Sequence, residues 1–279
     1  MNMDNTTSPI RTIARKVIFF IDPLVDRAIS RYLAKRNPAA PPREFSEEEK
    51  REIKQRIGKL AELPLPTDKA LKRVEIIVLK YKDPEVETIC ASRIIENTEW
   101  PYKLNFFDNR PGTKNMSKIW NQLVRESTCD YVLIIDSDAF VPKLTPCWLT
   151  RMMTVLLSED ACVAVLPKVT RTSCDQQRAQ VARDGAPELL AETFAAQCVL
   201  YKKDTFDKLG YFDEEFLMYG QDVEWSHRLL TSQWKAYILP DVLVEHLGHY
   251  SNKKAVIKNE YDKEAEGVYA HLLLEEKNA

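Results

Sequence analysis

Two aspartates stand at the end of an apolar stretch near the middle of the chain. Residues 131–135 read Tyr-Val-Leu-Ile-Ile, and Asp136, Ser137 and Asp138 follow directly. Such a run predicts a buried strand, and ligands bind beyond the carboxyl ends of strands in open α/β sheets. Two neighbouring carboxylates repel unless a cation neutralises them, and a hard divalent ion would also bind phosphate. The alternative is that one aspartate caps a helix or closes a turn.

Asp222, Glu224 and His246, which lie much further along the chain, could take part in the same chemistry. Asp222 and Glu224 lie where a helix is expected to begin. One of these carboxylates, if it reaches a substrate hydroxyl, can act as a general base. Capping is the alternative, because helix N-termini favour anions. His246 follows a predicted strand, where its role is either structural or metal-ligating, and an imidazole ligand favours Mn²⁺ over Mg²⁺.

Strands and helices alternate in the segment that carries these residues. We expect strands at 73–79, 102–107, 131–136, 161–166, 196–201, 237–239 and 242–245. Helices are expected at 84–96, 116–125, 148–157 and 203–209, and in a segment ending near 230. This alternation predicts an α/β fold with a mostly parallel sheet flanked by helices. The strand ends at Leu79, Asp108 and Asp136 should then share one edge and build one pocket.

The ends of the chain differ from this central part. Residues 1–66 predict a helical extension with proline-containing linkers, and residues 67–279 the main domain with a C-terminal helix. Residues 10–36 form a basic amphipathic pattern. That pattern fits a peripheral contact with an anionic membrane, a homo-oligomer contact, or packing on the chain's own domain.

Composition excludes several classes of protein. The 279 residues carry a formal net charge of -2, so there is no basic field of the kind that nucleic-acid binders use. The six cysteines contain no C-x-x-C pair, which predicts buried thiols in a reducing compartment. The apolar run at 17–21 is too short for a signal core or a membrane span. We therefore expect a cytoplasmic protein, either free or peripheral at the inner face of a membrane.

Several motifs in one order give the chain a family resemblance. They are Phe107-Asp-Asn109, the helix start Asn115 to Asn121, Ile135-Asp-Ser-Asp138, the block Leu209 to Glu224, and Glu245-His246 followed by Ser251. Together they resemble the inverting family-2 glycosyltransferases, which bind nucleotide sugars on the fold called GT-A. The long block with aromatic, glycine and acidic positions in register is the most specific of these motifs. The resemblance covers residues 74–251.

The resemblance implies roles for individual residues. Asp138 and His246 would ligate a divalent metal, Mn²⁺ with Mg²⁺ as the alternative. Asp222 would be the base that activates the acceptor hydroxyl, and Glu224 would support the helix or an acceptor contact. The implied nucleotide-sugar site comprises Leu79, Tyr81, Asp108, Asn109, Asn115, Asp136, Ser137 and Glu224. The donor would be a UDP- or dTDP-type sugar, and the acceptor a glycan, a lipid-linked molecule or a protein.

Two other functions are compatible with these residues. A nucleotidyltransferase that makes nucleotide sugars would share the strand-end aspartates, but it normally has a glycine-rich loop after the first strand, and residues 79–84 contain no glycine. A catalytically inactive, carbohydrate-binding or scaffolding homologue is the non-enzymatic alternative. Departures from the family pattern favour it, such as Gln221 in place of a glutamate and Ala195 to Cys198 in place of small glycine-type residues.

Overall fold

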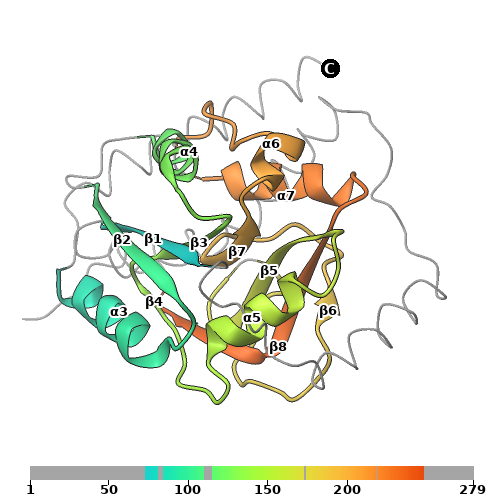
Figure 1. Ribbon diagram of the computed structural model, residues 1–279. Helices are drawn as coiled ribbons and strands as arrows, with labels where there is room; N and C mark the ends of the chain where they lie inside the picture. The colour runs from blue at the N-terminus through green and yellow to red at the C-terminus, as the bar shows by residue number, and fades with distance from the viewer. Residues whose placement is uncertain (1–72, 81–83, 110–114, 173, 218, 248–279) are drawn as a thin grey trace, which may run out of the picture.

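The computed structural model describes residues 73–80, 84–109, 115–172, 174–217 and 219–247. Eight strands form one sheet, in the order β2-β1-β3-β7-β5-β8-β4, with β6 joined to β8 (Figure 1). The strands are β1 (Val74–Lys80), β2 (Tyr102–Asp108), β3 (Tyr131–Asp136), β4 (Ala139–Phe140), β5 (Cys162–Val169), β6 (Glu188–Leu189), β7 (Cys198–Lys202) and β8 (Lys235–His246). The helices are α3 (Pro84–Asn97), α4 (Met116–Glu126), α5 (Trp148–Leu156), α6 (Thr205–Leu209) and α7 (Gln221–Leu230).

The sheet has two parallel parts joined by one reversed strand. Strands β1, β2 and β3 run parallel, as do β5 and β8, and β7 is antiparallel to both of its neighbours, β3 and β5. The short strands β4 and β6 are antiparallel to β8. The five longest strands therefore share one direction. The α/β fold class predicted from the sequence, with a mostly parallel sheet flanked by helices, is confirmed.

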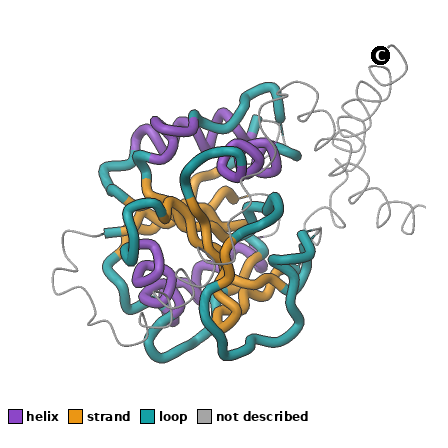
Figure 2. The backbone as a smooth tube through the Cα atoms, turned by 90° about the vertical axis from the view of Figure 1, so that its right-hand side faces the viewer, coloured by secondary structure: helices purple, strands orange, loops and turns teal. Residues whose placement is uncertain are grey.

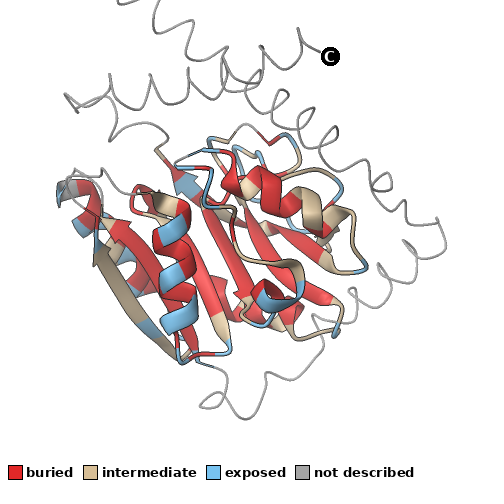
Figure 3. Ribbon diagram, turned by 90° about the horizontal axis from the view of Figure 1, so that it is seen from above, coloured by how far each residue is buried: buried red, intermediate tan, exposed pale blue. Residues whose placement is uncertain are grey.

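Helices cover both faces of this sheet, as the side view shows (Figure 2). Because side chains alternate along a strand, Ile76 and Val78 of β1 join the core under α3 and α5, while Ile77 joins the core under α4, α6 and α7. The central strands are buried along nearly their whole length (Figure 3). Continuous apolar runs such as 76–79 and 162–166 are the sequence pattern of such two-sided burial.

The end of the sheet differs from the prediction in two ways. Residues 237–239 and 242–245 belong to one strand, β8, which passes through Pro240. Pairing with β5 shifts register there: Pro167 lies opposite Leu239, and Lys168 lies opposite Leu243. Proline lacks an N–H for the ladder and is tolerated at such an irregularity. The prediction also missed β4 and β6, which are two residues long and too short for a periodic signal.

Some expectations concern parts of the chain that lie outside the described residues. The helical extension 1–66, the amphipathic segment 10–36 and the C-terminal helix fall there. Among the described helices, none combines the length and hydrophobicity of a membrane span. All six cysteines are free and buried, as the sequence predicted.

Candidate functional site

Asp136, Asp138 and His246 come together at one edge of the sheet. Asp136 ends β3, and His246 ends β8. The short strand β4 begins directly after Asp138 and pairs with the end of β8, with Ala139 opposite His246. The N–H of Leu247 donates to the carbonyl of Asp138 at 3.1 Å. The unpredicted strand β4 is therefore what brings the late histidine to the aspartates.

The side chains of these three residues could hold one metal ion. One candidate ligand atom from each lies within 4.8 Å of the others. His246 Nε2 is 3.2 Å from Asp138 Oδ1 and 3.5 Å from Asp136 Oδ2. Asp138 and His246 are buried, while the side chain of Asp136 is 32% exposed, so the cluster is open on the Asp136 side. Two carboxylates and an imidazole form a donor set that suits Mn²⁺.

The ring of His246 already has the orientation that a metal ligand requires. Its Nδ1 lies 2.7 Å from the carbonyl oxygen of Arg171, which can only accept a hydrogen bond, so Nδ1 carries a proton and Nε2 faces the carboxylates. Burial lowers the pKa of His246, but the hydrogen bond to Asp138 and the charges of Asp138 and Asp136 outweigh it and raise that pKa to about 9. A divalent ion must displace the proton on Nε2, because ligation requires the neutral imidazole.

Asp222 lies in the first turn of α7. The preceding Gly220 has φ 88°, a left-handed conformation that glycine adopts without strain. The carboxylate of Asp222 accepts hydrogen bonds from the backbone N–H of Ala196 at 2.8 Å and of Val223 at 2.9 Å. Burial raises the pKa of Asp222, and these backbone donors partly offset the increase. The result is a half-buried carboxylate in a fixed orientation.

Two successive residues connect Asp222 to the cluster of Asp136, Asp138 and His246. Ala196 donates its N–H to Asp222, and the carbonyl of the next residue, Gln197, accepts from the N–H of Asp136 at 3.0 Å. The segment before β7 thus holds a helix-borne carboxylate on one side and a strand-borne one on the other. The structure therefore brings Asp222 to the same end of the sheet as Asp136, Asp138 and His246.

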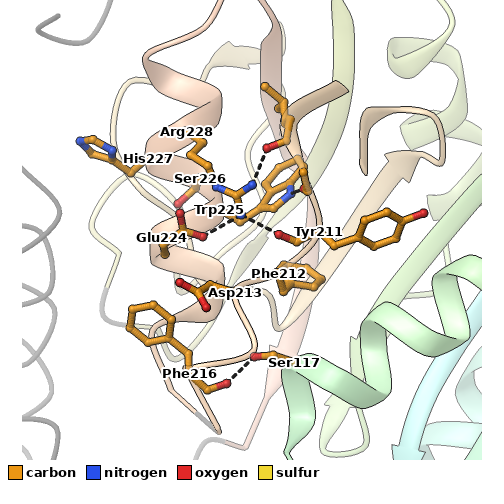
Figure 4. Close-up of polar contacts among 12 residues, drawn as sticks. Ser117, Tyr211, Phe212, Asp213, Phe216, Glu224, Trp225, Ser226, His227 and Arg228 are labelled. Carbon is orange, nitrogen blue, oxygen red and sulfur yellow. Dashed lines mark hydrogen bonds and ion pairs between the residues drawn. The ribbon is translucent and has the colours of Figure 1, made fainter. Parts of the chain in front are cut away.

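Glu224 has a different environment, shown in Figure 4. Its carboxylate pairs with Arg228 one turn later on α7, at 2.7 Å. The guanidinium of Arg228 also donates to the carbonyls of Leu209 and Tyr211, which lie before the helix. Gly210 beside Arg228 has φ 87°, a conformation that L side chains rarely adopt, so glycine is favoured there. Arg228 thus holds α7 to the segment that precedes it, and Glu224 supports the guanidinium that makes these contacts.

Four of the remaining predicted nucleotide contacts, Leu79, Asp108, Asn109 and Ser137, lie in or directly after β1, β2 and β3. Asp108 ends β2 opposite Lys80, and Asp136 ends β3 opposite Leu79, so both aspartates lie on the same edge of the sheet. Asp108 is exposed, whereas Leu79 is buried in the sheet. Asn109 and Ser137 are also buried. Tyr81 lies outside the described residues.

Asn115 and the start of α4 bind the long block that precedes α7. Asn115 caps α4 by accepting from Lys118 N at 2.9 Å, and it donates to the carbonyl of Glu214 at 2.6 Å. Ser117 donates to the carbonyl of Phe216 at 2.5 Å (Figure 4). Asn121 both donates to the carbonyl and accepts from the N–H of Phe212. The two motifs that the sequence singled out separately are thus one packed unit.

Sequence reasoning missed the residues that orient the site through their backbones. The carbonyls of Arg171 and Gln197 and the N–H of Ala196 fix His246, Asp136 and Asp222. Backbone N–H and carbonyl groups do not depend on residue type, so only the position of these residues in the chain could have identified them. Arg171 and Gln197 both lie next to strand ends at the predicted edge.

The sequence matches no protein-family model and no curated protein. Solved structures with similar folds include GalNAc-T7 with UDP, GalNAc and Mn²⁺, at 10% identity, TM-score 0.47, and coverage of 75% of this chain and 54% of that one. The Pyrobaculum calidifontis mannosyltransferase PcManGT, in complex with GDP-Man and Mn²⁺, has 15% identity, TM-score 0.49, and coverage of 80% and 68%. S. aureus TarS 1-349 has 12% identity, TM-score 0.45, and coverage of 64% and 62%. The chain thus spans about half of the GalNAc-T7 structure.

Proposed function

We propose that this protein is a metal-dependent, inverting glycosyltransferase of the GT-A type, similar to family 2. It would move a sugar from a nucleotide diphosphate donor of the UDP or dTDP type to a hydroxyl on a glycan, a lipid-linked molecule or a protein. The observation that carries this proposal is the Asp136–Asp138–His246 cluster, whose candidate ligand atoms lie within 4.8 Å of one another at the end of the sheet that also holds Asp222.

The metal site would consist of Asp138 and His246, with Mn²⁺ as the preferred ion and Mg²⁺ as the alternative. A bound divalent ion supplies Lewis-acid stabilisation of the charge that develops on the leaving diphosphate. Asp136 is the most exposed member of the cluster, which supports a contact with the ribose or the sugar. The Arg171 carbonyl keeps Nε2 of His246 turned toward the carboxylates.

Asp222 is the proposed general base. Glycosyl transfer passes through a cationic sugar, and a base on the opposite side from the leaving group removes the proton of the attacking hydroxyl. The backbone donors Ala196 and Val223 fix the position of the carboxylate, and burial raises its pKa, which increases its affinity for that proton. In-line attack from that side inverts the anomeric carbon.

The nucleotide would lie along the ends of β1 and β2. Asp108 ends β2, and Asn109 follows it, at the edge of the sheet that also carries Asp136, which supports a contact between Asp108 and the nucleobase. Leu79, Tyr81, Asn115 and Ser137 complete the predicted nucleotide-sugar site. Glu224 would act behind Asp222 by supporting α7, as its ion pair with Arg228 indicates.

A donor screen tests this function directly. The full-length protein is incubated with UDP-, dTDP- and GDP-sugars, with simple glycoside acceptors, and with or without Mn²⁺. We expect Mn²⁺-dependent release of nucleoside diphosphate, and a product whose anomeric configuration, read by NMR, is opposite to that of the donor. Retained configuration would overturn the inverting mechanism. Pyrophosphate formation from sugar phosphate and nucleoside triphosphate would indicate a nucleotidyltransferase, and no turnover with any donor would indicate a binding or scaffolding protein.

A further inference from the structure

The strand that carries His246 extends beyond its neighbour in the sheet. Strand β5 ends at Val169, which pairs with Val244 of β8, and the N–H of Thr170 still donates to the Val244 carbonyl at 3.2 Å. β8 continues for two more residues, to His246. No residue of β5 is therefore available to pair with the backbone N–H and carbonyl of His246 on that side.

The hydroxyl of Thr170 takes the place of the missing strand. Its Oγ1 accepts from the backbone N–H of His246 at 3.0 Å and donates to the backbone carbonyl of His246 at 3.2 Å. His246 is buried, so leaving these two groups unpaired would be costly. Serine or threonine at position 170 can make both bonds, and no apolar side chain can.

The next residue fixes the imidazole ring. The carbonyl of Arg171 binds Nδ1 of His246, and the guanidinium of Arg171 donates to the carbonyl of Leu247 at 2.7 Å. On its other side, His246 pairs with Ala139, directly after Asp138. The β4 pairing thus sets the spacing between His246 and Asp138, while Thr170 and Arg171 set the backbone and ring of the histidine.

We infer that Thr170 is a positioning residue for the metal site: its hydroxyl holds the backbone of His246 so that Nε2 faces Asp138 and Asp136. This inference rests on the metal site of the proposed function. Outer contacts that orient a ligating histidine typically change metal affinity by about 10- to 100-fold when they are lost. Position 170 has no ligand atom of its own in the cluster, so its effect passes through His246 alone.

Direct measurement of Mn²⁺ binding tests this inference without any substrate. The full-length protein is titrated with Mn²⁺, and free Mn²⁺ is followed by electron paramagnetic resonance. Thr170→Val removes the hydroxyl at nearly constant volume, and we expect it to weaken Mn²⁺ binding by about 10-fold or more. Thr170→Ser keeps the hydroxyl and should stay within about threefold of wild type, because the rescue depends on the hydrogen bonds rather than on the methyl group.

Two further variants separate the possible failures. Thr154→Val removes a threonine hydroxyl that bonds the carbonyl of Thr150 within α5, and it should leave Mn²⁺ affinity unchanged. Asp138→Asn removes a proposed ligand and should abolish tight binding. If Asp138→Asn binds Mn²⁺ like wild type, the metal site and the proposed function fail together. If Asp138→Asn loses binding but Thr170→Val stays within twofold of wild type, or Thr170→Ser binds as weakly as Thr170→Val, only the role of Thr170 is wrong.

A third substitution keeps the test decisive if Thr170→Val does not fold. Thr170→Cys has a similar size and only a weak hydrogen-bond donor. We expect its Mn²⁺ affinity to fall below that of Thr170→Ser by severalfold. Equal affinities of the Cys and Ser variants, with melting temperatures alike, would overturn the inference.

Discussion

The negative charges of the acidic residues at the end of β3 and at the start of α7 are compensated by different kinds of groups. The carboxylates of Asp136 and Asp138 both lie close to the imidazole of His246. Glu224 pairs with a guanidinium, and Asp222 accepts two backbone hydrogen bonds. The α7 carboxylates therefore pair with a guanidinium and with backbone N–H groups, whereas the strand-end pair lies beside an imidazole that could share a metal ion with it. Similar residue types thus have hydrogen-bonding and ion-pair partners within the protein at α7, whereas at the end of β3 they form a group that could hold a metal ion.

Asp222 lies on α7 and is also the proposed general base, so its replacement should have the largest effect on activity. Asp222→Asn keeps an oxygen that can accept from Ala196 N–H, so α7 should stay in place. It loses the ability to take a proton, and transfer should fall by about 100- to 10,000-fold. Donor and Mn²⁺ affinities, measured by calorimetry, should remain within about threefold of wild type. Turnover close to wild type would exclude Asp222 as the base.

Removal of one strand-end carboxylate should have the next largest effect. A ligand at 100 times its dissociation constant stabilises a protein by about 2.7 kcal/mol. Asp138→Asn should lose this Mn²⁺-dependent gain, read as the change in melting temperature on adding Mn²⁺. The matched control is Asp204→Asn, which changes an exposed aspartate that pairs with Lys208. If both variants respond to Mn²⁺ like wild type, the strand-end pair does not bind the metal.

The same contrast explains how much of the structure could be predicted from the sequence. Strand β3 and the first part of β5 are continuous apolar runs, and β1 is one apart from Glu75, so the burial of these three strands and the position of Asp136 followed from residue type. The meeting of Asp138 with His246 depends on β4, a two-residue pairing between segments more than 100 residues apart. Local sequence carries no signal for such a pairing. The expected closeness of the two residues came from family resemblance, and the structure supplies its physical cause.

The α4–α7 region shows the opposite case. Asn115, Ser117 and Asn121 have residue types typical of a polar binding site, and the resemblance places Asn115 at the nucleotide sugar. In the structure their side chains bond the backbone of residues 212–216. Residue type cannot tell a polar group that binds a ligand from one that binds a loop. The contact between Asn115 and a donor stays a prediction.

The smallest effect on activity, and a clear effect on stability, is expected at Glu224. Glu224→Ala leaves the guanidinium of Arg228 without its carboxylate in a site where that side chain is only 23% exposed. The free energy of unfolding should fall by roughly 1–3 kcal/mol, measured by urea denaturation, because a partly buried charged group loses its partner. Glu126→Ala removes an exposed glutamate bonded to Gln122 on α4 and should change stability by less than about 0.5 kcal/mol. Donor affinity of the folded Glu224→Ala protein should stay within about twofold of wild type, since the carboxylate acts by holding α7. A large loss of donor affinity with unchanged stability would show instead that Glu224 contacts the donor.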